Sequence, residues 1–321
     1  MISRRTLISI VPAAAAMAAM PAIAQQNVIR IVVPFAPGAS TDMLARLVGQ
    51  KVAERIGKIS LVENKSGAGG QIGLQYVAKA QADGNTLLLT PSGPMVITAH
   101  LLKVPYDPLK DLTPVAMVAY VPTAIAVNAD TPYKSLQDLL AAAKNSDKPI
   151  NYSVSALGTH MHLSGELLSR VTSTNFASVA YRGAAPATTA VAAGEVPMTI
   201  SDLNTLLPFA RSNRIRILAL TGGQRTKAAP DIPTVSELGV KGYSADAWIG
   251  LFAPAGTPEA VIERLNEETS RVLAQPDVVG VLQGAGLEAL PMSLARMRSF
   301  VAKDSSKWAE LIRDARIKVE Q

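Results

Sequence analysis

Hydroxyl groups and turn-forming residues are concentrated in one short segment near the start of the chain, residues 34–42 (PFAPGASTD). The segment follows residues 28–33, an apolar, β-branched run too short for a helix, which we interpret as a buried strand. Apolar residues then recur at helical spacing until Gly57, so Ser40 or Thr41 is placed to cap a helix. A helix start presents unpaired N–H groups and the positive end of the helix dipole. The segment therefore has the donors needed to hold a small carboxylate.

A second segment repeats this order of strand, small polar loop and helix. Residues 150–155 form the expected strand, and a helical pattern occupies residues 160–171. Between them, Ser155, Gly158 and Thr159 make a second candidate anion site, although an ordinary strand-to-helix loop would look the same. The other candidate ligand contacts in these two segments are Phe35, Ala39, Asp42, Leu157 and His160.

Three charged candidates have competing interpretations. Asp42 has the wrong charge to meet a carboxylate and more plausibly caps or orients its loop. Arg182 is either a carboxylate-binding fork or a solvated residue at a loop rim. Asp202 ends an expected strand and is either a ligand contact or a helix cap before Leu203. The remaining candidate contacts are Ser92, Tyr181, Gly183 and Ala184.

The sequence lacks the residue patterns that nucleotide binding, metal binding and serine hydrolysis require. The first segment has neither the glycine spacing of a dinucleotide fingerprint nor the lysine of a phosphate loop. His160 and His162 are two residues apart, which is not a metal-binding spacing on a helix, and His100 is the only other histidine. Ser92-Gly93 follows Thr90-Pro91, so the leading glycine of a hydrolase nucleophile elbow is missing. We therefore expect no catalytic residues, no metal and no cofactor.

The N-terminal residues indicate export. Arg4 and Arg5 precede an apolar, alanine-rich run, and Ala22-Ile23-Ala24 matches a cleavage site, so residues 1–24 are predicted to be a signal peptide. Both Sec and twin-arginine export fit this segment. The sequence contains no cysteine, so we expect neither a lipid anchor nor disulfides. The formal net charge of +6 is scattered and aromatic residues are 4% of the chain, which argues against a nucleic-acid surface.

Short apolar runs alternate with helical patterns along the chain, which predicts an α/β fold. Two apolar stretches, near residues 123–128 and 247–252, are candidate crossings between two lobes, with ligand bound at strand ends between them. The expected helices are 135–144, 160–171, 187–193 and 258–273, the last with Thr257 as its N-cap and Pro258 as its first residue. The expected strands are 28–33, 59–63, 86–90, 123–128, 150–155, 176–181, 197–201, 215–220 and 247–252.

From residue 28 onward the chain resembles the extracytoplasmic solute receptors of tripartite tricarboxylate transporters, also called Bug proteins. Each motif is weak alone, but the set in this order is specific. The resemblance departs at Gly38-Ala39, where the family usually has two glycines, and at residues 178–181, where it often has His-Val-Pro-Tyr. The motifs are PFAPG through Asp42, GAGGQIG (67–73), DGNTLL (83–88), YDPLKDLTPV (106–115), GTHMHL (158–163) with Gly165-Glu166, YRG (181–183), PTVSELG (233–239) and PAGTP (254–258).

The resemblance implies a type II periplasmic binding protein with two doubly wound lobes joined by two crossover strands. Residues 25–125 and 248–321 would form the first lobe, and residues 126–247 the inserted second lobe. Such a protein is a monomer, free in the periplasm of a Gram-negative bacterium, that binds a mono- or dicarboxylate and delivers it to the membrane permease subunits of the transporter. Asp202 resembles a position that family members use to select an amine or amide, and His162 matches the family's motif histidine. The alternatives are a periplasmic ligand sensor for a two-component system and an exported hydrolase.

Overall fold

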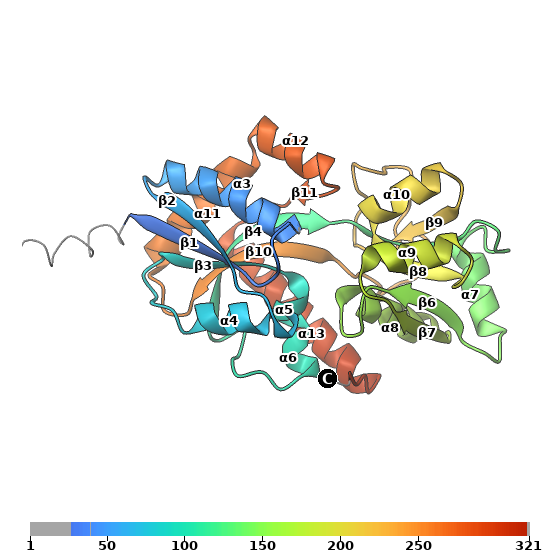
Figure 1. Ribbon diagram of the computed structural model, residues 1–321. Coiled ribbons are helices and arrows are strands. Elements are labelled where there is room, and N and C mark those ends of the chain that lie inside the picture. The colour runs from blue at the N-terminus through green and yellow to red at the C-terminus, as the bar shows by residue number, and fades with distance from the viewer. Residues whose placement is uncertain (1–26, 39, 320–321) are drawn as a thin grey trace, which may run out of the picture.

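The computed structural model describes residues 27–38 and 40–319, and its strands form two separate sheets. Figure 1 shows these sheets toward opposite ends of the molecule, with the chain passing twice between them. We call each sheet with the helices packed on it the first half and the second half. The predicted signal peptide (1–24) and the candidate contact Ala39 lie outside the described residues.

The first half is built on a six-stranded sheet in the order β11-β4-β10-β3-β1-β2. β1 is parallel to β2 and β3, whereas β10 is antiparallel to β3 and β4. Helices α3, α11 and α12 bury one face of this sheet, and helices α4 and α13 bury the other. Its strands are β1 (Val28–Val33), β2 (Ile59–Asn64), β3 (Thr86–Pro91), β4 (Leu112–Val121), β10 (Ala247–Pro254) and β11 (Glu288–Ala289). Its helices are α3 (Ser40–Arg55), η1 (Ala68–Gly70), α4 (Gln71–Ala78), α5 (Ser92–Val96), α6 (Thr98–Leu101), α11 (Glu259–Leu273), α12 (Pro276–Gly284) and α13 (Leu294–Asp314).

The second half is built on a five-stranded sheet in the order β7-β6-β8-β5-β9. β6 is parallel to β7 and β8, and β5 is antiparallel to β8 and β9. Helices α9 and α10 pack on one face, and α7 and α8 on the other. Its strands are β5 (Thr123–Asn128), β6 (Ile150–Val154), β7 (Phe176–Ala180), β8 (Met198–Asp202) and β9 (Ile215–Leu220). Its helices are α7 (Leu136–Lys144), α8 (His160–Thr172), α9 (Ala184–Ala192) and α10 (Leu203–Arg211).

The chain changes sheet first at Pro122, which separates β4 from β5, and returns between β9 and β10. Proline has no N–H group to donate to a sheet ladder, so a change of partner at this residue leaves no donor unpaired. Its carbonyl oxygen accepts a hydrogen bond from the N–H of Leu203 at 2.8 Å. The first lobe predicted from the sequence ends at residue 125, inside β5, whereas the change of sheet occurs at Pro122.

The expected strands are confirmed to within a few residues, but two strands were missed. No strand was predicted at β4, because Pro114 interrupts its apolar run, or at β11, which has only two residues. The predicted cap of α11 is wrong: Pro258 is the N-cap residue, with ψ 136°, and the helix begins at Glu259. The Thr257 hydroxyl instead donates to the carbonyl oxygen of Pro254 at 2.8 Å and closes the preceding turn.

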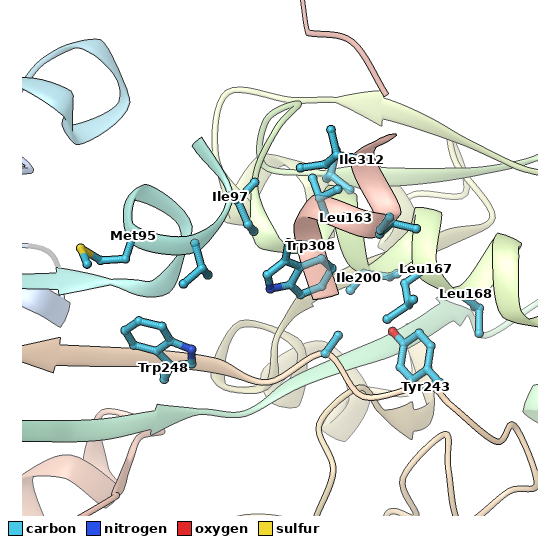
Figure 2. Close-up of a cluster of buried hydrophobic side chains, with 14 of the residues drawn as sticks. Met95, Ile97, Leu163, Leu167, Leu168, Ile200, Tyr243, Trp248, Trp308 and Ile312 are labelled. Atoms are coloured by element: carbon cyan, nitrogen blue, oxygen red, sulfur yellow. The ribbon is translucent and has the colours of Figure 1, made fainter. Parts of the chain in front are cut away.

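The last helix joins the two halves through a shared hydrophobic core. The first part of α13 packs on the first sheet, and its last turns place Trp308, Leu311 and Ile312 in the same buried cluster as Leu163 of α8. Figure 2 shows Trp308 lying between side chains of both halves. An ion pair of 2.6 Å between Arg170 of α8 and Asp314 joins the same two helices. In the part of the chain that the structure describes, no helix has the length and apolar character needed to cross a membrane.

Candidate functional site

A cavity of about 940 Å³ lies between the two halves, where several helices begin. The first residues of α3, α4 and α8 line it, together with Asp202, the N-cap residue of α10. Three of these helices follow strands β1, β6 and β8 directly, and the carboxyl ends of parallel strands in an open sheet are where ligands bind. The wall consists of Phe35, Ser40, Thr41, Ala68, Gly69, Gln71, Pro91, Ser92, Gly93, Pro94, Thr98, Leu101, Leu102, Lys103, Val121, Ser155, Ala156, Leu157, Gly158, Thr159, His160, Met161, Asp202, Ala247, Trp248, Ile249, Leu287 and Val319.

The loop before α3 brings Phe35, Ser40 and Thr41 to the cavity. The prediction that Ser40 or Thr41 is the N-cap residue is wrong, because α3 already begins at Ser40 and both residues lie in its first turn. Ser40 is exposed and Thr41 is buried. The first turn of a helix has N–H groups without intrahelical partners, so this position can offer both backbone and hydroxyl donors to an anion.

Asp42 fixes this loop through side-chain hydrogen bonds and does not line the cavity. Its Oδ2 atom accepts the N–H of Gly38 at 3.1 Å, and its Oδ1 atom accepts Asn64 Nδ2 at 2.9 Å. Arg46, one turn later in α3, donates to both oxygens at 3.1 Å. Burial tends to raise the pKa of Asp42, but the hydrogen bonds from Arg46, Asn64 and Gly38 outweigh it and lower that pKa below its usual value. The side chain thus orients the loop.

The loop before α8 brings Ser155, Leu157, Gly158, Thr159 and His160 to the cavity. Thr159 is the N-cap residue, and its hydroxyl accepts the N–H of His162 at 3.4 Å and donates to the carbonyl oxygen of Ala156 at 2.8 Å. That hydroxyl is therefore already engaged within the loop. Among the described residues, the Ser155 hydroxyl has one weak contact, 3.6 Å from the sulfur of Met161, so it could also donate to a ligand.

His162 has a hydrogen-bond partner within the loop, whereas the Nε2 atom of His160 is buried without one among the described residues. His162 Nδ1 accepts the N–H of Gly158 at 3.0 Å, and burial lowers the pKa of His162 to about 4. His160 meets the ring of Trp308 edge-on, with ring centroids 5.4 Å apart, and burial lowers its pKa to about 4 as well. Both imidazoles are therefore neutral at pH 7.

The candidate contacts Tyr181, Arg182, Gly183 and Ala184 lie beside the cavity and are not part of its wall. The N–H of Gly183 donates to the carbonyl oxygen of Ser155 at 3.1 Å, so this segment supports the loop before α8. Gly183 has φ 119°, a conformation that favours glycine. Arg182 is exposed.

Asp202 lies in the cavity wall, and its side chain is half-buried. It is the N-cap residue of α10, but its side chain makes no capping hydrogen bond. Within the described residues it has neither a hydrogen bond nor an ion pair, and burial raises its pKa to about 6. Asp202 therefore occupies the N-cap position predicted before Leu203, but its side chain does not cap the helix.

The sequence reasoning missed the residues that reach the cavity from distant parts of the chain. Trp248 and Ile249 of β10 and Leu287 border the cavity but are almost fully buried, whereas Val319 is half-buried and adds apolar surface. Trp248 is fully buried, and its indole N–H donates to Asp304 at 2.8 Å. Gln71 belongs to the GAGGQIG motif, whose glycines were the one available signal. Within the described residues, no cluster of three or more His, Asp or Glu side chains is placed to hold a metal ion.

Comparison with known proteins identifies the family. The family described as "Tripartite tricarboxylate transporter family receptor" matches residues 44–317. The chain belongs to this family. It is a solute receptor of the periplasmic binding protein class, which confirms both the resemblance and the fold class predicted from the sequence.

Relatives of this receptor cover nearly its full length. It is 33% identical to BugT of Bordetella pertussis over 294 residues, 91% of this chain and 90% of BugT. Among solved structures, Rpa4515 of R. palustris with adipate is 34% identical, with a TM-score of 0.75 over 91% of this chain and 98% of that one. MatC from Rhodopseudomonas palustris with bound malate is 30% identical, with a TM-score of 0.71 over 89% and 98% of the two chains.

Proposed function

We propose that this receptor captures a small carboxylate in the cavity between its halves and delivers it to the membrane permease of a tripartite tricarboxylate transporter. The observation that carries the proposal is the meeting of α3 and α8, one from each half, with their first residues in one cavity. Both helices are long enough for a developed dipole, and their positive ends favour a negative charge between them. The adipate and malate bound by two relatives have this chemistry.

The donors that we assign to the carboxylate are mainly neutral. Ser40, Thr41 and Ser155 offer hydroxyl groups, and the first turns of α3 and α8 offer backbone N–H groups. Lys103 is the one cation in the described wall, and it is exposed. A hydrogen bond to a charged group contributes about 1.5–3 kcal/mol, so a few such donors suffice for tight binding.

Ligand binding is proposed to bring the halves together as two lobes that turn about the segments near Pro122 and β10. A ligand that contacts both helix starts favours the closed arrangement by its differential affinity. Small-angle scattering at ligand saturation is expected to show a smaller radius of gyration than the free protein. An unchanged radius would contradict the proposed motion.

A thermal-shift screen of organic acids and amino acids tests the ligand class. A ligand present at 100 times its Kd is expected to stabilise the protein by about 2.7 kcal/mol. Incubation with acyl and ester substrates is expected to give no turnover, because we propose a receptor without catalysis. Stabilisation by no carboxylate at all would contradict the proposed function.

Delivery to a permease needs a separate experiment. Uptake of the radiolabelled ligand is expected to disappear when the receptor gene is deleted and to return with the wild-type chain. Normal uptake in the deletion strain would contradict the transport role.

A further inference from the structure

The proposed function accounts for the carboxylate group of the ligand but not for the size of the cavity. Its volume of about 940 Å³ is near the upper end of the range of roughly 300–1,000 Å³ that is typical of small-molecule sites. A carboxylate group at the starts of α3 and α8 would occupy a small part of this space. The rest of the ligand must therefore meet the wall residues whose side chains remain accessible.

One part of the wall presents accessible apolar side chains. Leu157, in the loop before α8, is 43% exposed although it is a large hydrophobic residue. Leu101 of α6 and Val319, which follows α13, are half-buried. Trp248 and Ile249 of the same wall are almost fully buried and offer little surface. Accessible apolar side chains in a cavity are stabilised when a hydrocarbon or aromatic group covers them.

Leu101 and Val319 meet at Gly158, the residue after Leu157. A Cβ atom placed on Gly158 would lie 3.3 Å from Leu101 Cδ1 and 3.4 Å from Val319 Cγ2. Gly158 also has φ 73°, a conformation that favours glycine. The glycine thus lets apolar side chains from α6, from the loop before α8 and from the segment after α13 come together beside the start of α8.

The turn after α13 holds Val319 in this position. Arg316 has φ 52°, a left-handed conformation that is uncommon for residues other than glycine, and it turns the chain at the end of the helix. The N–H of Ile317 donates to the carbonyl oxygen of Ile312 at 3.0 Å, and the Ile317 side chain packs against the large hydrophobic core. α13 contacts both α6 and α8, and Figure 1 shows its end beside them. Val319 is therefore fixed as part of the wall.

We propose that Leu101, Leu157 and Val319 form an apolar subsite that takes the hydrocarbon body of the ligand. The receptor then prefers a carboxylate with an extended aliphatic or aromatic body, and Leu157 and Val319 are specificity-determining residues. The inference rests on the proposed function, since it assumes that the carboxylate group lies at the starts of α3 and α8.

Titration calorimetry at pH 7 with butanoate, hexanoate and octanoate tests the inference. In the wild type we expect affinity to rise up to about fourfold for each added methylene that the subsite covers. Leu157→Ala and Val319→Ala are each expected to weaken octanoate binding about 5- to 10-fold and to leave butanoate within about twofold.

Two matched variants serve as controls. Leu109 is 45% exposed, as Leu157 is, but lies outside the cavity wall, and Lys318 is the exposed neighbour of Val319. Leu109→Ala and Lys318→Ala are expected to leave the affinity for all three acids within about twofold.

The dependence of affinity on chain length separates ligand contact from a structural role. If Leu157 and Val319 only supported the loop before α8, their substitution would weaken butanoate and octanoate by the same factor, and that result would overturn the inference. Equal binding of the three acids by the wild type would overturn it as well. Binding of other carboxylates but of none of these three would overturn the inference alone, whereas binding of no carboxylate would overturn the proposed function with it.

Discussion

The two helix starts that meet in the cavity resemble each other in sequence but are held in different ways. The loop before α3 is fixed from behind by Asp42, a carboxylate that accepts hydrogen bonds from Gly38, Asn64 and Arg46. The loop before α8 is fixed from within, by the Thr159 hydroxyl and the His162 imidazole. Among the described residues, no hydrogen bond of the first arrangement uses the Ser40 or Thr41 hydroxyl, whereas the second uses the Thr159 hydroxyl for its own structure.

This difference separates residues that shape the site from residues that we propose to contact the ligand. In the first loop the two roles belong to different side chains, so they can be removed independently. In the second loop Thr159 combines them, because it lines the cavity and also caps α8. Substitutions in the two loops should therefore divide their effects differently between stability and affinity.

The largest effect is expected for Asp42→Ala, which removes the acceptor of several hydrogen bonds at once. Bonds to a charged group contribute about 1.5–3 kcal/mol each and are not additive, so we expect the free energy of unfolding to fall by about 3 kcal/mol. Ligand affinity should fall with it, because the α3 start is no longer held in place. Urea unfolding and calorimetry measure the two quantities.

Asp277→Ala is the matched control for that variant. Asp277 also lies in the first turn of a helix and pairs with Lys51 at 2.8 Å, but it is mostly exposed. An exposed pair of this kind contributes about 0–1 kcal/mol. If Asp42→Ala costs no more than Asp277→Ala, Asp42 does not hold the loop and the contrast between the two helix starts is lost.

As pH falls, the second loop should lose its contribution to the free energy of unfolding at a higher pH than the first loop does. The unfolded chain binds protons at a histidine near pH 6.5, whereas burial lowers the pKa of His162 to about 4, so stability falls as pH decreases between these values. This residue alone should account for a loss of about 2 kcal/mol between pH 7 and pH 5. Asp42, whose pKa is lowered, loses its contribution only as pH falls through the ordinary aspartate range and below.

Urea unfolding of the wild type and His162→Gln at the two pH values measures this contribution. The variant should be less stable at pH 7 but should lose about 2 kcal/mol less on acidification than the wild type. His160 titrates in the same window, also with a pKa lowered to about 4 by burial, and remains in both proteins. An identical loss in the two proteins would show that His162 does not couple the second loop to pH.

Ser155 and Thr159 should separate ligand contact from capping. Ser155→Ala removes a hydroxyl whose one described contact is the sulfur of Met161, so we expect about 10-fold weaker ligand binding and little change in stability. Thr159→Val removes the cap of α8 and should cost about 1 kcal/mol of stability as well as affinity. Thr159→Ser keeps the capping hydroxyl and serves as the control. Equal stability of Thr159→Val and the wild type would contradict the capping role.

Arg182→Gln is expected to have the smallest effect on affinity, within about twofold, because Arg182 is exposed and lies outside the cavity wall. Its charge should act mainly on the association rate, with an effect that fades at high salt. Stopped-flow binding at two ionic strengths measures this. Abolished binding in this variant, with affinity retained in Ser155→Ala, would show that a guanidinium group holds the carboxylate.

Local sequence patterns were sufficient to predict most strands and to place both helix starts within a residue or two, although the N-cap of α3 was wrong. Each of these features depends on residues within one or two turns, such as the β-branched run at 28–33 and the polar residues before α8. β4 was missed because Pro114 breaks its pattern, and its place beside β10 is fixed only by contacts distant in sequence. The surroundings of Asp202 could not be predicted either, because its lack of a charged neighbour among the described residues depends on how distant segments pack. The same holds for Leu287 and Val319 in the wall of the site.

The position of β10 in the first sheet has a consequence for the order in which the chain folds. β10 lies between β3 and β4, although residues 247–254 follow the whole second half in sequence. During synthesis, β1, β2 and β3 can pair with one another, but β4 cannot join them before β10 has been made. The five strands of the second sheet, all contained in residues 123–220, are complete earlier. Pairing across such sequence separations is slow, so we expect the second half to become protease-resistant first. A nascent chain that ends before residue 247 lacks the central strand of the first sheet and Trp248 at the cavity. Ligand binding can therefore stabilise only chains whose synthesis has passed β10.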